Sequence, residues 1–167
     1  MPPPKIVDPA QLDCRALLHT RDEIYAVLPQ KHEFALLDGI IHVDWENSIV
    51  AGFRDLRTDE WWCRGHMPGN PIFPGVLMVE CAAQLAAFCQ HLYHKGAYGD
   101  FLGFGGFDGG KFRLAVAPPT RLIFIVKMIE ARTRRIVCDA QAFNEGAMIF
   151  EGKITGVPMH LEAGRSE

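Results

Sequence analysis

The most constraining feature of this sequence is a long apolar stretch that directly follows a loop rich in proline and glycine. Residues 75–93 carry a single formal charge, that of Glu80. A helix over this stretch would extend about 30 Å at ~1.5 Å per residue, which is long enough to cross a membrane. Its polar side chains would be costly in hydrocarbon; they are Glu80, Gln84, Gln90 and His91. We therefore expect a helix buried within a protein core and no membrane insertion.

The segments on either side of this helix have a clear local character. Residues 65–75 contain three prolines and three glycines, which excludes a helix or a central strand and predicts a shaped loop. The glycines between 103 and 110 are expected to mark a bulge or a close backbone approach. Residues 144–146 are expected to form a hairpin turn. Strands are expected over Phe101–Phe112, Arg121–Ile129, Arg135–Phe143 and Ala147–Ile154.

The N-terminal third has weaker signals. Thr20 followed by acidic residues predicts a short helix that Pro29 ends. Residues 35–43 form an apolar run with a turn-like Asp38-Gly39, residues 47–53 are expected to be a strand, and Trp61-Trp62 a short extended piece. One long helix followed by several strands predicts an α+β fold, an antiparallel sheet wrapped around one helix. We expect a loosely packed N-terminal extension over 1–18, a domain over 19–157 and a tail over 158–167.

Composition narrows the class of protein. A net charge of −3 and the lack of a basic tail give no reason to expect a nucleic-acid partner. No apolar run follows Lys5 near the start, so we expect no secretory signal there. The five cysteines are odd in number and contain no Cys-x-x-Cys pair, which favours reduced thiols in a cytoplasmic protein.

Residues 65–84 read GHMPGNPIFPGVLMVECAAQ. This segment resembles the signature of the β-hydroxyacyl-acyl carrier protein dehydratases: a Gly-His-x-Pro-Gly loop, then Pro-x-x-Pro-Gly-Val-Leu, then Glu-x-x-x-Gln on a helix. Weaker similarity extends over roughly residues 20–156. The resemblance implies the hotdog fold and a homodimer, or a higher even-numbered homo-oligomer, with its sites at the subunit interface.

The resemblance also implies a reaction, the removal of water from a 3-hydroxyacyl thioester carried on acyl carrier protein or CoA. His66 suits the base, because imidazole titrates near neutral pH. Glu80 suits the acid if burial beside an apolar acyl chain keeps it protonated. The N–H of Gly75 at the helix start is a candidate donor to the thioester carbonyl. Gln84, one turn after Glu80, either hydrogen-bonds Glu80, lines the pocket or is solvated.

Three further side chains are expected to shape the substrate pocket, namely Met67, Phe73 and Val76. Met67 stands where the family usually has phenylalanine, and Phe73 where methionine is common, which affects substrate choice more than chemistry. The proposed reaction requires no cofactor. We expect no metal site either, since His91 and His94 have no apparent third ligand.

Other functions remain open at this stage. A hotdog acyl-thioester hydrolase usually activates water with a carboxylate and lacks this histidine loop. A non-catalytic acyl-binding module would have kept the pocket without activity. A dehydratase for polyketide, specialised lipid or pigment assembly would share the same residues.

One segment is strongly basic. Residues 111–135 contain seven basic residues and one acid, Glu130, in a chain that is acidic overall. The segment is either a solvated sheet face or a docking patch for an acidic carrier protein or its phosphate-bearing arm, with Arg132 and Arg135 as the contact residues.

Overall fold

The computed structural model describes residues 3–95 and 99–160. In chain order its elements are η1 (Pro9–Gln11), β1 (His19–Thr20), α1 (Arg21–Val27), η2 (His32–Phe34), β2 (Gly39–Asp44), β3 (Ile49–Leu56), α2 (Gly75–His94), β4 (Phe101–Phe112), β5 (Thr120–Arg132), β6 (Arg135–Asn144) and β7 (Ala147–Met159). Most of the expected tail, residues 161–167, lies outside the described residues.

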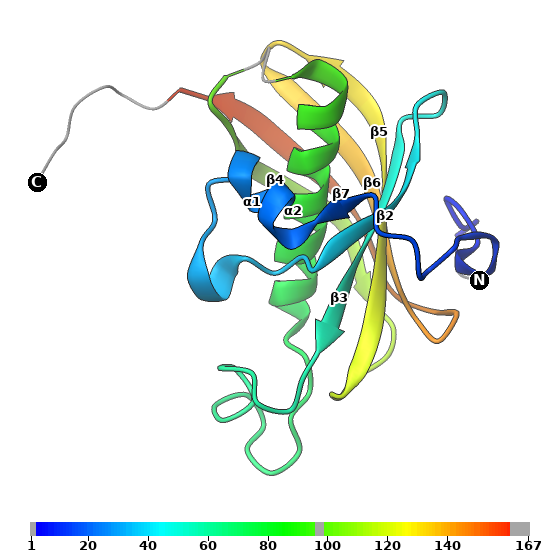
Figure 1. The fold of residues 1–167 in the computed structure, drawn as a ribbon, viewed down its shortest axis with the longest axis vertical. Helices are drawn as coiled ribbons and strands as arrows, with labels where there is room; N and C mark the ends of the chain where they lie inside the picture. The colour runs from blue at the N-terminus through cyan, green and yellow to red at the C-terminus, as the bar shows by residue number, and fades with distance from the viewer. Residues whose placement is uncertain (1–2, 96–98, 161–167) are drawn as a thin grey trace, which may run out of the picture.

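The strands form one antiparallel sheet in the order β1-β2-β3-β5-β6-β7-β4. The sheet curls around α2, which runs along its inner face (Figure 1). This arrangement confirms the predicted α+β fold with one long helix enclosed by an antiparallel sheet. It also places the loop between β3 and α2, residues 57–74, at the end of the molecule where α2 begins (Figure 1).

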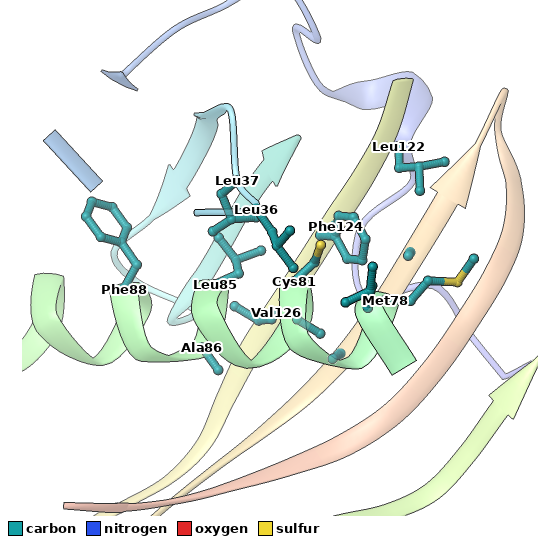
Figure 2. Packing of buried hydrophobic residues seen from close by; sticks show 14 of the residues in the cluster. Leu36, Leu37, Met78, Cys81, Leu85, Ala86, Phe88, Leu122, Phe124 and Val126 are labelled. Atoms are coloured by element: carbon teal, nitrogen blue, oxygen red, sulfur yellow. The ribbon is translucent and has the colours of Figure 1, made fainter. Parts of the chain in front are cut away.

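The main core lies between α2 and the sheet. Side chains from α2, from the segment before β2 and from β5 meet there (Figure 2), among them Leu36, Leu37, Cys81, Leu85, Phe124 and Val126. By length and by its mean hydropathy of 1.3, α2 could cross a membrane, and 56% of its most apolar window is buried inside the fold. The apolar stretch is therefore the core helix of the domain, because the sheet accounts for its hydrophobicity.

Local sequence explains where the helices begin and end. The Thr20 hydroxyl accepts the Glu23 N–H, and the Glu23 carboxylate accepts the Thr20 N–H, so a capping box starts α1 as predicted. The helix ends at Val27, before Pro29. Lys95 terminates α2 in the left-handed conformation (φ 45°).

The strands after α2 match their predicted positions, with longer ends for β5 and β7. Glu145 (φ 48°) and Gly146 (φ 80°) form the two-residue turn between β6 and β7. In β4 the register shifts at Phe104/Gly106 and at Asp108/Lys111, so the glycines mark bulges as expected. A Cβ on Gly152, in the neighbouring β7, would stand 2.2 Å from the Phe107 ring, a close approach that only glycine allows.

Two expectations fail in the segment before α2. Trp61 and Trp62 lie in consecutive turns, and neither is extended. Trp62 is buried edge-to-face on Phe73, with ring centroids 5.3 Å apart, so packing under the loop decides its conformation. Asp38-Gly39 is not a turn, because β2 starts at Gly39 and the Asp38 N–H donates to the Phe53 carbonyl at 2.9 Å.

The expectation of a loose N-terminal extension also fails. The Gln141 side chain in β6 accepts the Ile6 N–H at 2.8 Å and donates to the Pro4 carbonyl at 3.0 Å. Apolar side chains of the segment, Ile6, Val7, Leu12 and Cys14, pack against a second cluster on the outer face of the sheet: Ile41, Ile49, Ala51, Phe53, Ile123, Ile125 and Phe143. The extension thus covers an apolar sheet face that would otherwise be exposed to water.

Candidate active site

The loop that carries the signature histidine is anchored by a buried ion pair. Arg54 on β3 and Glu60 in the loop are 4% and 7% exposed. Their side chains meet at 2.5 Å, and the Asp38 carboxylate lies 3.6 Å from the same guanidinium. Glu60 also accepts the N–H of Cys63 through its main-chain carbonyl. The pair fixes the start of the loop because both charges lack access to water as an alternative partner.

His66 is held in a defined tautomer. Its backbone N–H donates to the Trp62 carbonyl at 2.8 Å, and its ring Nδ1 lies 2.7 Å from the Ile72 carbonyl. A carbonyl oxygen can only accept, so Nδ1 carries the proton. In the neutral ring Nε2 is therefore unprotonated and has the lone pair that a general base needs.

A pocket of about 410 Å³ opens beside His66 at the start of α2. Loop, helix and the segment after β4 contribute its lining: His66, Ile72, Phe73, Gly75, Met78, Phe112, Arg113, Leu114 and Ala115. Gly75 faces the Phe112 ring, which a Cβ would approach to 3.0 Å. As the first residue of α2, Gly75 has an N–H with no acceptor inside the helix, and the helix dipole favours negative charge there.

Glu80 lies on α2 and is half-buried. Its Oε1 accepts a hydrogen bond from Gln84 Nε2 at 2.8 Å. The predicted hydrogen bond between Gln84 and Glu80 is therefore confirmed. The alternative of a solvated Gln84 is wrong, because this residue is 1% exposed.

The structure brings only some of the predicted site residues together within one chain. Phe73 and Gly75 share the pocket with His66, whereas Glu80 is not part of its lining. Among the described residues, no hydrogen bond or ion pair joins His66 to Glu80. Met67 has a positive φ of 60° and its side chain is exposed, and Val76 is 75% exposed. Neither reaches the pocket of its own chain.

The basic segment is less charged than its sequence suggests. Arg113 pairs with Glu151, and Arg121 pairs with Asp55 at 2.6 Å. Arg132 and Arg135 both contact Glu130, at 3.2 and 2.8 Å, and the hydrogen bonds from Arg135 hold the pKa of Glu130 below its usual range. Arg132 and Arg135 lie at the hairpin between β5 and β6, at the far end of the sheet from the loop that carries His66 (Figure 1).

The sequence did not predict the side chains that hold the candidate site residues in place. These are Tyr25, which contacts Gln84, and the pair formed by Arg54 on β3 and Glu60 in the loop. A tyrosine on a short amphipathic helix and an arginine inside an apolar strand were the available signals. Within residues 3–95 and 99–160, no group of three or more histidine, cysteine, aspartate or glutamate side chains is placed to hold a metal ion.

Comparisons with known proteins identify the family of this chain. The family described as FabA-like domain matches residues 28–153. The 3-hydroxyacyl-(acyl-carrier-protein) dehydratase FabZ of Brucella abortus is 34% identical over 134 residues, covering 80% of this chain and 85% of that protein. The protein of the same name from Allorhizobium ampelinum is 35% identical over 144 residues, covering 84% and 90%.

Solved structures share the fold at low identity. The dehydratase heterocomplex ApeI:P from Xenorhabdus doucetiae matches with a TM-score of 0.69 at 14% identity, covering 81% of this chain and 90% of that one. Zebra fish thioesterase superfamily member 2 matches with a TM-score of 0.63 at 8% identity, covering 83% and 95%. Such similarity supports the hotdog architecture alone. The family match and the sequence relatives also show which family the chain belongs to. This chain belongs to the FabA-like family.

Proposed function

We propose that this protein is a dehydratase that converts a 3-hydroxyacyl thioester, carried on acyl carrier protein or CoA, to the trans-2-enoyl thioester in fatty acid synthesis or a related pathway. The observation that carries the proposal is the fixed tautomer of His66, which in the neutral ring leaves the Nε2 lone pair free beside a pocket at the start of a helix. Family membership and the dehydratase names of the sequence relatives support it.

The proposed reaction uses three groups. His66 Nε2 takes the proton from the carbon next to the thioester carbonyl. The carbonyl oxygen gains negative charge, which the Gly75 N–H stabilises at the positive end of α2. The bond from the third carbon to its hydroxyl then breaks, and Glu80 donates the proton that lets the hydroxyl leave as water. His66 has gained one proton and Glu80 has lost one, and exchange with solvent resets the pair.

The surface that one chain leaves exposed supports a proposal for the subunit arrangement. β4 is at the end of the sheet, and in the described part of the chain no strand pairs with its outer edge. The side chains of Phe104, Phe112, Met67 and Val76 expose large apolar surfaces. A second copy would cover them, so we propose an isologous homodimer in which His66 faces Glu80 of the partner subunit. This arrangement would explain why the two groups are not in contact within one chain.

Mixed dimers test this arrangement. His66→Ala and Glu80→Gln homodimers should both be inactive, whereas a verified heterodimer should recover up to about half of the wild-type activity, because one of its two composite sites is intact. No recovery in a verified heterodimer would place both groups in one chain.

We propose that Arg132 and Arg135 help to dock an acidic carrier. With Arg134 they give the exposed hairpin three arginines against Glu130. If the two α2 helices run antiparallel across the twofold axis, this hairpin lies near the end where the partner's α2 begins. Charge steering weakens with salt, with a screening length of about 8 Å at physiological strength. Glutamate at both positions should raise KM for carrier-bound substrate more than it lowers kcat, and equal effects on carrier-free substrates would make the hairpin ordinary surface.

The decisive experiment incubates the purified protein with 3-hydroxyacyl thioesters of several chain lengths and follows loss of water by mass spectrometry. His66→Ala and Glu80→Gln should each lower kcat by about a hundred- to ten-thousand-fold. Glu33→Gln, at an exposed position, is the matched control and should retain wild-type turnover. Release of free acid would instead identify a thioester hydrolase, and binding without turnover an acyl-binding module. All five cysteines are free thiols, which fits the cytoplasmic location that we propose.

A further inference from the structure

The amide of Gln84 has four hydrogen-bonding partners, and they leave it no freedom. Its Oε1 accepts from the Tyr25 hydroxyl at 2.5 Å and from the Leu36 N–H at 3.3 Å. Its Nε2 donates to the Phe34 carbonyl and to Glu80 Oε1, both at 2.8 Å. A side-chain amide has two donor hydrogens and two acceptor lone pairs, so the capacity of Gln84 is used completely.

The backbone partners set the direction of every bond in this group. The Phe34 carbonyl can only accept and the Leu36 N–H can only donate, so the amide cannot be flipped. The Tyr25 hydroxyl accepts the Leu37 N–H at 2.7 Å, which directs its own proton to Gln84. Burial raises the pKa of Tyr25, so this hydroxyl stays protonated. Hydrogen bonds thus run in one direction, from Leu37 through Tyr25 to Gln84.

This fixed direction has a consequence for the carboxyl group of Glu80. Its Oε1 accepts the N–H of Gln84, and the carbonyl oxygen of a carboxylic acid accepts a hydrogen bond more strongly than its hydroxyl oxygen does. When Glu80 is protonated, this bond therefore favours the proton on Oε2. An acid that transfers its proton from one defined oxygen avoids the cost of reorienting the carboxyl group during the reaction.

We propose that Tyr25 is a positioning residue for the dehydration, acting through Gln84 to hold Glu80 Oε1 and leave Oε2 to deliver the proton. The role rests on the proposed function of Glu80 as the acid. Tyr25 lies on α1 and touches neither His66 nor the pocket beside it. Its influence on the reaction passes through a single side chain, which makes the proposal separable from a general contribution to folding.

A double-mutant cycle tests this dependence. Tyr25→Phe keeps the ring and removes the hydroxyl, and we expect kcat to fall about tenfold with little change in KM. Gln84→Leu should lower kcat at least as far. In the Gln84→Leu background Tyr25→Phe should have no further effect, because the group through which it acts is gone.

Tyr93→Phe is the matched control. The Tyr93 hydroxyl donates to the Asp44 carbonyl near the other end of α2, so its loss removes a tyrosine hydrogen bond without touching Gln84. We expect Tyr93→Phe to lower the melting temperature and to leave kcat unchanged.

A second readout does not depend on activity. The side-chain amide of Gln84 gives a pair of NMR signals. These signals are assigned by comparison with Gln84→Leu, in which they are absent. Slow hydrogen exchange of this amide is expected in the wild type and in Tyr93→Phe, and faster exchange in Tyr25→Phe. A full Tyr25→Phe effect on kcat in the Gln84→Leu background, or an amide that exchanges equally slowly in Tyr25→Phe, would overturn the positioning role. A wild-type protein without dehydration activity would instead overturn the proposed function, and the role with it.

Discussion

Replacing Arg54 with methionine should destabilise this protein more than the loss of any surface ion pair. Arg54 lies among buried residues, 2.5 Å from Glu60 and 3.6 Å from Asp38. Methionine has a similar length and no charge. The change leaves the Glu60 carboxylate in the interior with the Arg57 N–H, at 3.3 Å, as its remaining donor. Asp38 keeps its contact with Arg21 at 2.8 Å, so Glu60 bears most of the loss.

The expected size of the effect follows from this burial. Removing one member of a buried ion pair costs about 3–5 kcal/mol, because the other charge stays desolvated. In a domain of this size each kcal/mol lowers the melting temperature by roughly 2–4 °C, which gives a fall of roughly 6–20 °C. Arg57→Met is the matched control, since Arg57 pairs with Asp59 at 3.2 Å with both side chains largely exposed. An exposed pair contributes about 0–1 kcal/mol.

Scanning calorimetry at equal protein concentration measures both variants. The double variant Arg54→Met/Glu60→Leu should recover much of the loss, because no unpaired charge is then left in the interior. The loop that carries His66 should also loosen in Arg54→Met, so kcat for the proposed reaction, at a temperature well below the melting point, should fall. If Arg54→Met instead melts within about 2 °C of Arg57→Met, burial has no consequence for the stability of the Arg54–Glu60 pair.

Three further predictions concern stability. Removing residues 1–14 uncovers the outer apolar cluster and should cause aggregation that light scattering detects, whereas a Gln141→Leu variant should only weaken the attachment. Gly152→Ala should destabilise by about 1–3 kcal/mol in denaturant unfolding because its Cβ meets the Phe107 ring, while Gly106→Ala, with 3.8 Å to its nearest neighbour, should be tolerated. Thr20→Ala should lose about 1 kcal/mol of stability at neutral pH. Hydrogen bonds from Thr20 lower the pKa of Glu23. The stability that these bonds add is therefore present above the usual glutamate pKa and is lost as the pH falls through the lowered pKa. The difference in stability between Thr20→Ala and the wild type should shrink in acid.

Elements with strong local signals were predictable from the sequence. The apolar run of α2, which has one formal charge, lies between Pro74 and Lys95, so the helix has the expected ends. The turn at Glu145 and Gly146 was predictable because Gly146 adopts without strain the positive φ that a two-residue turn requires at its second position. The Trp61-Trp62 pair was not, since aromatic residues favour extended backbone on average and here a buried contact with Phe73 decides otherwise. The attachment of the N-terminal segment depends on Gln141, 135 residues away, which no local pattern encodes.

The same distinction applies to the candidate site. The motif identified which side chains have reactive groups, because loop glycines and prolines and a lone carboxyl on an apolar helix are visible as residue types. Their protonation geometry depends on single acceptors and donors that the motif does not specify. The Ile72 carbonyl sets the tautomer of His66, and the backbone groups of Phe34 and Leu36 set the direction of the bond that Glu80 receives from Gln84. A relative with the full motif and no equivalent of Tyr25 would keep its glutamine in place by other contacts. If Tyr25 has the positioning role that we propose, variation at this position alters the rate of dehydration while His66 and Glu80 stay the same.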